Sequence, residues 1–166
     1  HDTLDLAIAE MRNIVRGMAG KSLPLSQLLA ELRAECMARC ESAGIEMEWP
    51  LPAEPAADDP LLDYRLYRHV TSILRELVSN LIRHAGATRA SIDLRVDEQY
   101  LRCRLSDNGQ GFDGSLRRAD GNGMENMRRR AAAMNATLVF APRPDGTLAE
   151  LEVPLQAFMQ TGTQHD

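Results

Sequence analysis

The longest regular pattern in the chain is LLDYRLYRHVTSILRELVSNLIRHAG, residues 61–86, and it predicts a helix over residues 61–85. Apolar residues recur there every three or four positions and form one broad face. They are Val70, Ile73, Leu74, Leu77, Val78 and Leu81. Gly86 is expected to end the helix, because glycine adopts the backbone geometry that terminates helices.

The polar side of this helix carries candidate functional residues. At about 100° per residue, Glu76, Asn80 and Arg83 lie within about 60° of one another, and His84 borders that stripe. A carboxylate, an amide and a base beside an apolar face could line a site. The alternative is a solvated helix face, which is the commonest fate of such residues. The helix alone leaves both interpretations open.

Helix and strand signals alternate around this segment. Residues 25–43 have helical spacing with Gly44 as a stop, and residues 45–49 alternate as a half-buried strand. Residues 50–60 contain four prolines and are expected to form a loop.

The second half of the chain reads mainly as strands. Alternation predicts strands over residues 89–96 and 101–105, joined as a hairpin, and over 137–141 and 147–153, with a helix over about 123–134. Five strands on one side of three helices, mostly antiparallel, predict an α/β two-layer sandwich.

The two ends of the chain are set apart from this unit. Residues 3–18 show a short heptad pattern, which indicates either a helix packed on its own domain or the stump of a dimerisation helix. Glycines and a proline predict a linker over 19–24. The predicted division is therefore residues 1–24, a domain over 25–156, and a tail over 157–166.

Composition limits the function classes. The chain has 166 residues, 44% of them apolar, and a formal net charge of −5, which argues against a general nucleic-acid binder. No apolar run is long enough to span a membrane, and no signal peptide is visible at the start. The chain has three cysteines, which cannot all form disulfides with one another, and this is typical of a protein in the reducing cytoplasm. Cys36 and Cys40 lie one helical turn apart, and core packing is favoured over metal binding.

Three glycine clusters follow the long helix. Asp107-Asn108-Gly109-Gln110-Gly111-Phe112 ends a predicted strand, where it could approach a ligand or form an ordinary turn. Gly121-Asn122-Gly123 precedes a helix and could offer N–H groups to a phosphate. Gly146-Thr147 opens the last predicted strand.

In this order and spacing, the motifs resemble the ATP-binding catalytic domain of bacterial sensor histidine kinases, which has the Bergerat fold of the GHKL superfamily. Residues 75–87, RELVSNLIRHAGA, resemble the N box, and their ending is similar to the NarX/DesK-like branch. Residues 107–112 and 121–130 resemble the two glycine boxes, and Gly146-Thr147 resembles the final Gly-Thr element. The resemblance covers about residues 25–156.

The resemblance implies a role for each matching residue. Asn80 would coordinate Mg²⁺, Glu76 would be catalytic near the γ-phosphate, and Asp107 would accept a hydrogen bond from the adenine amino group. Residues 113–123 would form a lid over ATP, to which Arg117 and Arg118 could add charge. The other implied nucleotide-binding residues are Arg83, His84, Gly109, Gly111, Gly121, Gly123, Met124 and Thr147.

The resemblance also implies a function and partners. The domain would transfer the γ-phosphoryl group of ATP to a histidine on a dimerisation domain of the same protein, for relay to a response-regulator aspartate. We expect a cytoplasmic domain that binds no nucleic acid, in a full-length homodimer that is compatible with membrane anchoring.

The chain departs from the family pattern at two places. Met124 and Asn126 replace a leucine and a glycine of the second glycine box. The residues after His1 match the second helix of the dimerisation hairpin, so His1 is not expected to be the phosphoacceptor, and the chain is not expected to phosphorylate itself. The alternatives are a GHKL-type ATPase, an anti-sigma serine kinase, or a degenerate interaction module of the same fold.

Overall fold

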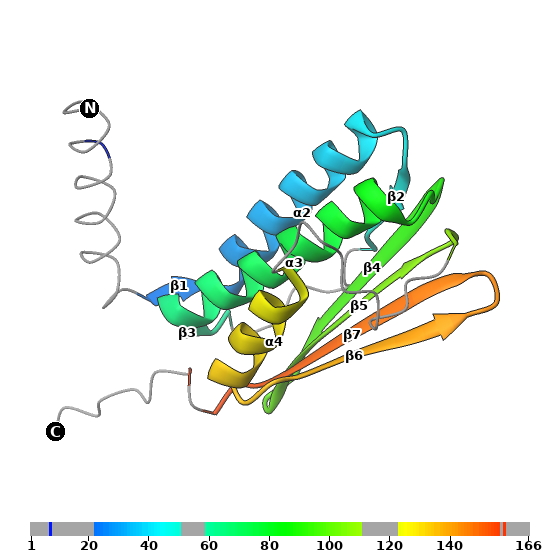
Figure 1. The fold of residues 1–166 in the computed structure, drawn as a ribbon. Helices are drawn as coiled ribbons and strands as arrows, with labels where there is room; N and C mark the ends of the chain where they lie inside the picture. The colour runs from blue at the N-terminus through cyan, green and yellow to red at the C-terminus, as the bar shows by residue number, and fades with distance from the viewer. Residues whose placement is uncertain (1–6, 8–21, 51–58, 111–122, 157, 159–166) are drawn as a thin grey trace, which may run out of the picture.

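In the described part of the chain, three helices cover one face of a five-stranded sheet (Figure 1). The computed structural model describes residues 7, 22–50, 59–110, 123–156 and 158. The helices are α2 (Leu25–Ser42), α3 (Tyr64–His84) and α4 (Gly123–Ala133). The strands of this sheet are β2 (Glu46–Glu48), β4 (Arg89–Val96), β5 (Tyr100–Asp107), β6 (Thr137–Arg143) and β7 (Gly146–Pro154). The predicted α/β two-layer sandwich is confirmed.

The strand order in the sheet is β2-β4-β5-β7-β6, with β2 and β4 parallel and all other neighbours antiparallel. The central strand β5 therefore has β4 on one side and β7 on the other. In this register Asp107, the last residue of β5, pairs with Ala90 on β4 and with Thr147 on β7. The pairing thus brings the first glycine cluster, at the end of β5, next to the Gly-Thr element, at the start of β7.

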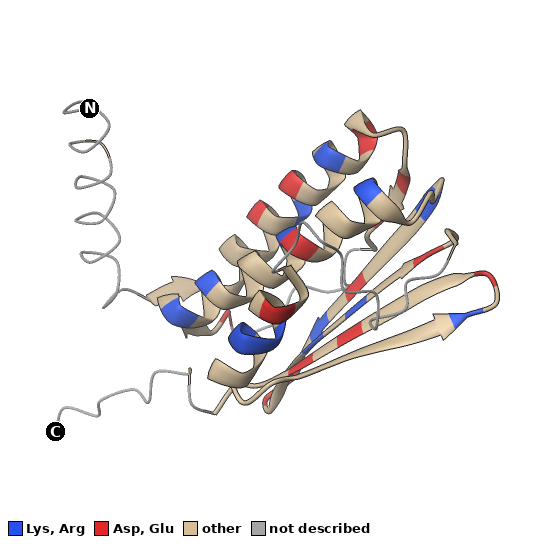
Figure 2. Ribbon diagram, in the orientation of Figure 1, with Lys and Arg blue, Asp and Glu red and all other residues tan. Residues whose placement is uncertain are grey.

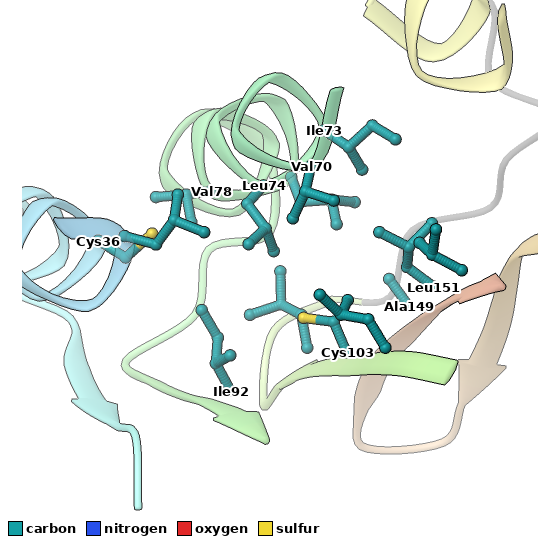
Figure 3. Close-up of a cluster of buried hydrophobic side chains, with 14 of the residues drawn as sticks. Cys36, Val70, Ile73, Leu74, Val78, Ile92, Cys103, Ala149 and Leu151 are labelled. Atoms are coloured by element: carbon teal, nitrogen blue, oxygen red, sulfur yellow. The ribbon is translucent and has the colours of Figure 1, made fainter. Parts of the chain in front are cut away.

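The core lies between α3 and the sheet. Figure 3 shows Leu74 of α3 pointing toward the strands that carry Ile92 and Cys103, and Val78 lying beside Cys36 of α2. The strands alternate as the sequence predicted, because a period of two places every second side chain on the helix-covered face. Cys36, Cys40 and Cys103 are all buried, and burial raises the pKa of the Cys103 thiol to about 12. The packing role predicted for Cys36 and Cys40 is confirmed.

The start of the long helix differs from the prediction. Residues 61–63, expected to be helical, form strand β3 (Leu61–Asp63), which pairs antiparallel with β1 (Ser22–Pro24). Residues 22–24 were predicted to be linker, so β1 is also a correction. The physical reason lies at Asp63, whose side chain accepts a hydrogen bond from the backbone N–H of Arg65 at 2.7 Å and caps the helix there.

Charged residues of both signs lie along the strands (Figure 2), and several of them pair across neighbouring strands. Arg104 on β5 pairs with Glu150 on β7 at 3.0 Å, and Arg102 pairs with Glu152 at 2.9 Å. Charges of both signs alternate with the core residues, which leaves the face of the sheet away from the helices suited to water. None of the helices in the described part of the chain has the length and apolar character needed to cross a bilayer.

Several predicted segments lie outside the described residues. These are nearly all of the heptad helix over 3–18, most of the lid over 113–123, and most of the tail over 157–166. Their predicted roles therefore stay predictions.

Candidate functional site

A cavity opens between α3 and the ends of strands β5, β6 and β7. The empty space between its lining atoms is about 390 Å³, a volume that includes space open to solvent. Its lining is mainly apolar, with a few polar groups. The lining residues are Leu77, Asn80, Leu81, His84, Ala85, Leu105, Asp107, Phe140, Thr147 and Ala149.

Helix α3 contributes one wall of the cavity. Asn80 and His84 are spaced by one helical turn, so both face the same side, and both line the cavity while remaining half-buried. Their apolar neighbours Leu77 and Leu81 also belong to the core face. The polar stripe predicted from the sequence therefore borders the core and is not simply a solvated helix face.

Glu76 lies one turn before Asn80 and reaches the start of another helix. A Cβ atom added to Gly123, the first residue of α4, would collide with Oε1 of Glu76. The carboxylate therefore lies against the N-terminus of α4, where helix N–H groups favour negative charge. Two motifs far apart in sequence, the N box and the second glycine box, meet at this point.

Asp107 provides the carboxylate of the cavity. The backbone N–H of Gly109 donates a hydrogen bond to Oδ1 of Asp107 at 2.8 Å. Burial raises the pKa of this carboxyl above its ordinary value of 3.8, while hydrogen bonds from the backbone N–H groups of Gly109 and Thr147 oppose the rise. The group is therefore partly desolvated but held in a defined orientation.

Two glycines permit close approaches around Asp107. A Cβ on Gly109 would collide with the carbonyl oxygen of Ala85, at the end of α3. Gly146 has φ +150°, and a Cβ there would collide with the carbonyl oxygen of Asp107. Only glycine allows the β5 end, the α3 end and the start of β7 to lie this close together.

The other predicted site residues are divided between several places. Thr147 is 5% exposed and lines the cavity, opposite Asp107 in the sheet. Arg83 is exposed and is not among the lining residues. Met124 is half-buried and packs against the core. Gly111 and Gly121 lie outside the described residues.

Sequence reasoning missed two residues near the cavity. Phe140 lines it from β6, and only the strand pairing brings that strand close to α3. The side chain of Asn108 bonds to the turn before β4. The inference from the Asp-Asn-Gly-Gln-Gly motif rested on its carboxylate and glycines, and nothing in the local pattern indicated the partner of the asparagine.

The donor set also bears on metal binding. The described residues contain no group of three or more His, Cys, Asp or Glu side chains that could hold a metal ion. Asn80 can offer one amide oxygen, a hard ligand of the kind Mg²⁺ accepts. Mg²⁺ usually keeps several waters and is completed by substrate phosphates, so a single protein oxygen is enough for a site of this kind.

Comparison with known proteins gives the family. Residues 66–157, more than half of the chain, match the family described as histidine kinase-, DNA gyrase B-, and HSP90-like ATPase. Sensor protein VraS of Staphylococcus epidermidis is 38% identical over 88 residues, which are 52% of this chain and 25% of VraS. VraS of Staphylococcus saprophyticus is 39% identical over the same shares. The matching region thus spans a quarter of these relatives.

Solved structures show the same fold. The histidine kinase AdeS of Acinetobacter baumannii superposes with a TM-score of 0.63 at 17% identity, over 82% of this chain and 67% of AdeS. The catalytic domain of histidine kinase ThkA gives a TM-score of 0.62 at 16% identity, over 81% of this chain and 96% of that domain. The glycine motifs, the cavity that they border and the family match agree, and the chain belongs to the histidine kinase-, DNA gyrase B- and HSP90-like ATPases.

Proposed function

We propose that this domain binds ATP with Mg²⁺ and, within a longer sensor protein, transfers the γ-phosphoryl group to a histidine. The observation that carries the proposal is that the Asp107 carboxylate and the Asn80 amide line one cavity with apolar walls. This arrangement offers a purine base a hydrophobic slot with one acceptor, and offers the phosphate end a hard oxygen ligand. Membership of an ATPase family and similarity to sensor proteins support it.

The base would bind between α3 and the strands. Adenine carries an exocyclic amino group that donates hydrogen bonds. Asp107 is an acceptor when ionised, and its two backbone bonds fix the carboxylate orientation. Leu105, Phe140 and Ala149 supply the apolar contacts that a base requires. Recognition would thus depend on one polar contact inside a largely apolar slot.

The phosphates would extend along α3 toward the start of α4. Glu76 lies one helical turn from Asn80 on α3, and its carboxylate lies against Gly123, the first residue of α4. Helix N-termini bind phosphate through free backbone N–H groups. Asn80 would hold Mg²⁺, which neutralises phosphate charge when bound. Glu76 would orient the attacking group at the γ-phosphate.

The reaction would exchange one bond for another. The bond between the γ-phosphorus and the bridging oxygen breaks, a bond from phosphorus to an imidazole nitrogen forms, and ADP leaves. Such transfers depend mainly on positioning and charge stabilisation. A response-regulator aspartate would then receive the phosphoryl group. The histidine would belong to a dimerisation domain of the same protein, in a homodimer whose catalytic domain lies in the cytoplasm.

A two-step experiment tests this function. The chain is first titrated with ATP by calorimetry, with Mg²⁺ and with EDTA. It is then mixed with γ-labelled ATP and a separately purified dimerisation domain from a VraS-type kinase, with a variant of that domain lacking the histidine as control. We expect Mg²⁺-dependent binding and acid-labile label on the histidine-containing domain alone.

The same experiment separates the alternatives. Steady phosphate release without protein labelling would indicate a GHKL-type ATPase. Acid-stable label on a serine of a protein substrate would indicate a serine kinase. The absence of ATP binding at millimolar concentration would contradict the proposal and favour an interaction module.

A further inference from the structure

Asn108 joins the strand that carries Asp107 to the turn that follows α3. Its side-chain oxygen accepts hydrogen bonds from the backbone N–H groups of Thr88 and Arg89, both at 2.9 Å. Its amide nitrogen donates to Oγ1 of Thr88 at 2.9 Å. One side chain therefore makes three hydrogen bonds to the last residue before β4 and the first residue of β4.

These bonds extend the sheet beyond its last backbone pair. The register of β4 and β5 ends at the pair Ala90 and Asp107, and the backbone N–H of Asn108 donates to the carbonyl of Arg89 at 3.1 Å. Beyond this last backbone bond, the side-chain oxygen of Asn108 accepts the hydrogen bonds from the N–H groups of Thr88 and Arg89. This is a local use of an asparagine amide in place of a backbone peptide group.

The turn held by Asn108 is continuous with the end of α3. Two further contacts link the same elements: Gln110 N–H donates to the carbonyl of Ala85 at 2.7 Å, and Gly109 packs against that carbonyl. Asp107 is the residue before Asn108, while Asn80 and His84 lie on α3. The position of the Asp107 carboxylate relative to α3 thus depends on the contacts that Asn108, Gly109 and Gln110 make with residues 85–89.

We propose that Asn108 is a positioning residue that sets the preference of the site for adenine over guanine, by holding the Asp107 carboxylate in register with α3. This inference rests on the proposed function, because it assumes that Asp107 meets the exocyclic group of a purine. Adenine presents an amino donor at that position, whereas guanine presents a carbonyl acceptor. A carboxylate held in place rejects guanine, because two acceptors would then face each other without a proton between them.

The variants separate positioning from folding. Asn108→Leu removes all three hydrogen bonds at similar size. Asn108, Thr88 and Arg89 are exposed, so water can satisfy the released N–H groups and the variant is expected to fold. Asn108→Asp keeps acceptors for both N–H groups, and the Thr88 hydroxyl can donate to its second oxygen. Gln99→Leu makes the same change from amide to hydrocarbon at an exposed position in the β4–β5 connection and serves as a matched control.

The measurement is the dissociation constant for ATP and for GTP, each with Mg²⁺, by calorimetry, with thermal melting as the check on folding. We expect Asn108→Leu to reduce the ratio of the GTP constant to the ATP constant by roughly threefold to tenfold. Asn108→Asp should restore most of that ratio, and Gln99→Leu should leave it at the parent value. A purely structural role would lower the melting temperature without changing the ratio.

Two results would overturn the inference while the proposed function stands. One is a folded Asn108→Leu variant with the parent's ATP affinity and selectivity, and the other is an Asn108→Asp variant as impaired as the leucine variant. If Asn108→Leu does not fold, Asn108→Ser replaces it, and unchanged selectivity in the folded serine variant would again refute the role. A parent chain that binds no ATP would refute the proposed function itself.

Discussion

Replacing Asp107 with asparagine provides a sharp test of the cavity. The two side chains have nearly the same shape, so packing is preserved while the charge is removed. The Gly109 N–H donates to Oδ1 of the aspartate at 2.8 Å, and the Thr147 N–H also bonds to the carboxylate. In the variant the Gly109 N–H would keep the carbonyl oxygen as its acceptor, so the new NH₂ group would take the place of the other carboxylate oxygen. A donor would then face the adenine amino group.

The size of the effect follows from the bond that is lost. A hydrogen bond to a charged group contributes about 1.5–3 kcal/mol, so ATP affinity should fall by about 10-fold to 150-fold. The stability of the ligand-free domain should not fall. Burial raises the pKa of Asp107, which means that folding disfavours its ionised form, and a neutral amide avoids that cost.

The assay is calorimetric titration of parent and variant with ATP and GTP, together with thermal melting. Asp93→Asn provides the control, because Asp93 pairs with Arg95 away from the cavity and the charge change is the same. We expect Asp107→Asn to weaken ATP binding, unlike Asp93→Asn, while its melting temperature is equal to or above that of the parent. Equal ATP affinity in the variant and the parent would refute the placement of the base beside Asp107.

Three further outcomes are expected. Asn80→Ala should weaken ATP binding in Mg²⁺ but leave binding in EDTA unchanged, and an equal loss in both would contradict its role as a metal ligand. Gly109→Ala should lower the free energy of unfolding by about 1–3 kcal/mol in urea titrations, because the new Cβ collides with the backbone of Ala85. The Arg75 hydrogen bond lowers the pKa of Glu35, so this pair should stabilise the fold above the ordinary pKa of 4.5 and lose that contribution as the pH falls through the lowered value. Because the pair is partly exposed, Glu35→Gln should flatten the acid limb of stability against pH only slightly, and an unchanged acid limb would argue against the pair.

Much of the fold could be predicted because its signals are local. The apolar face of α3 repeats with the helical period, and the strands around Ile92 and Cys103 alternate with a period of two. The short strands β1 and β3 could not be predicted in this way. Each has three residues, too few to show a period, and they form only because each supplies the other's hydrogen-bond partners.

Part of the candidate site could also be predicted from the sequence, but for a different reason. Glu76, Asn80 and Asp107 belong to motifs with a recognisable order, so the sequence identified them without showing how they meet. Arg83 belongs to the same motif as Asn80 but lies exposed, outside the cavity lining. A helical stripe about 60° wide spans both the cavity wall and the solvent boundary, and only packing decides on which side each residue lies.

By itself, the sequence determined the helix and strand types, the two-layer architecture and the order of the nucleotide-binding motifs, because these depend on periodicity and on residue chemistry within short segments. Only the tertiary structure decided that Asp107, Asn80 and Phe140 share one cavity, that Glu76 lies against Gly123, and that Asn108 joins β5 to the end of α3. These relations depend on strand pairing and helix packing between segments far apart in the chain, which no local pattern encodes.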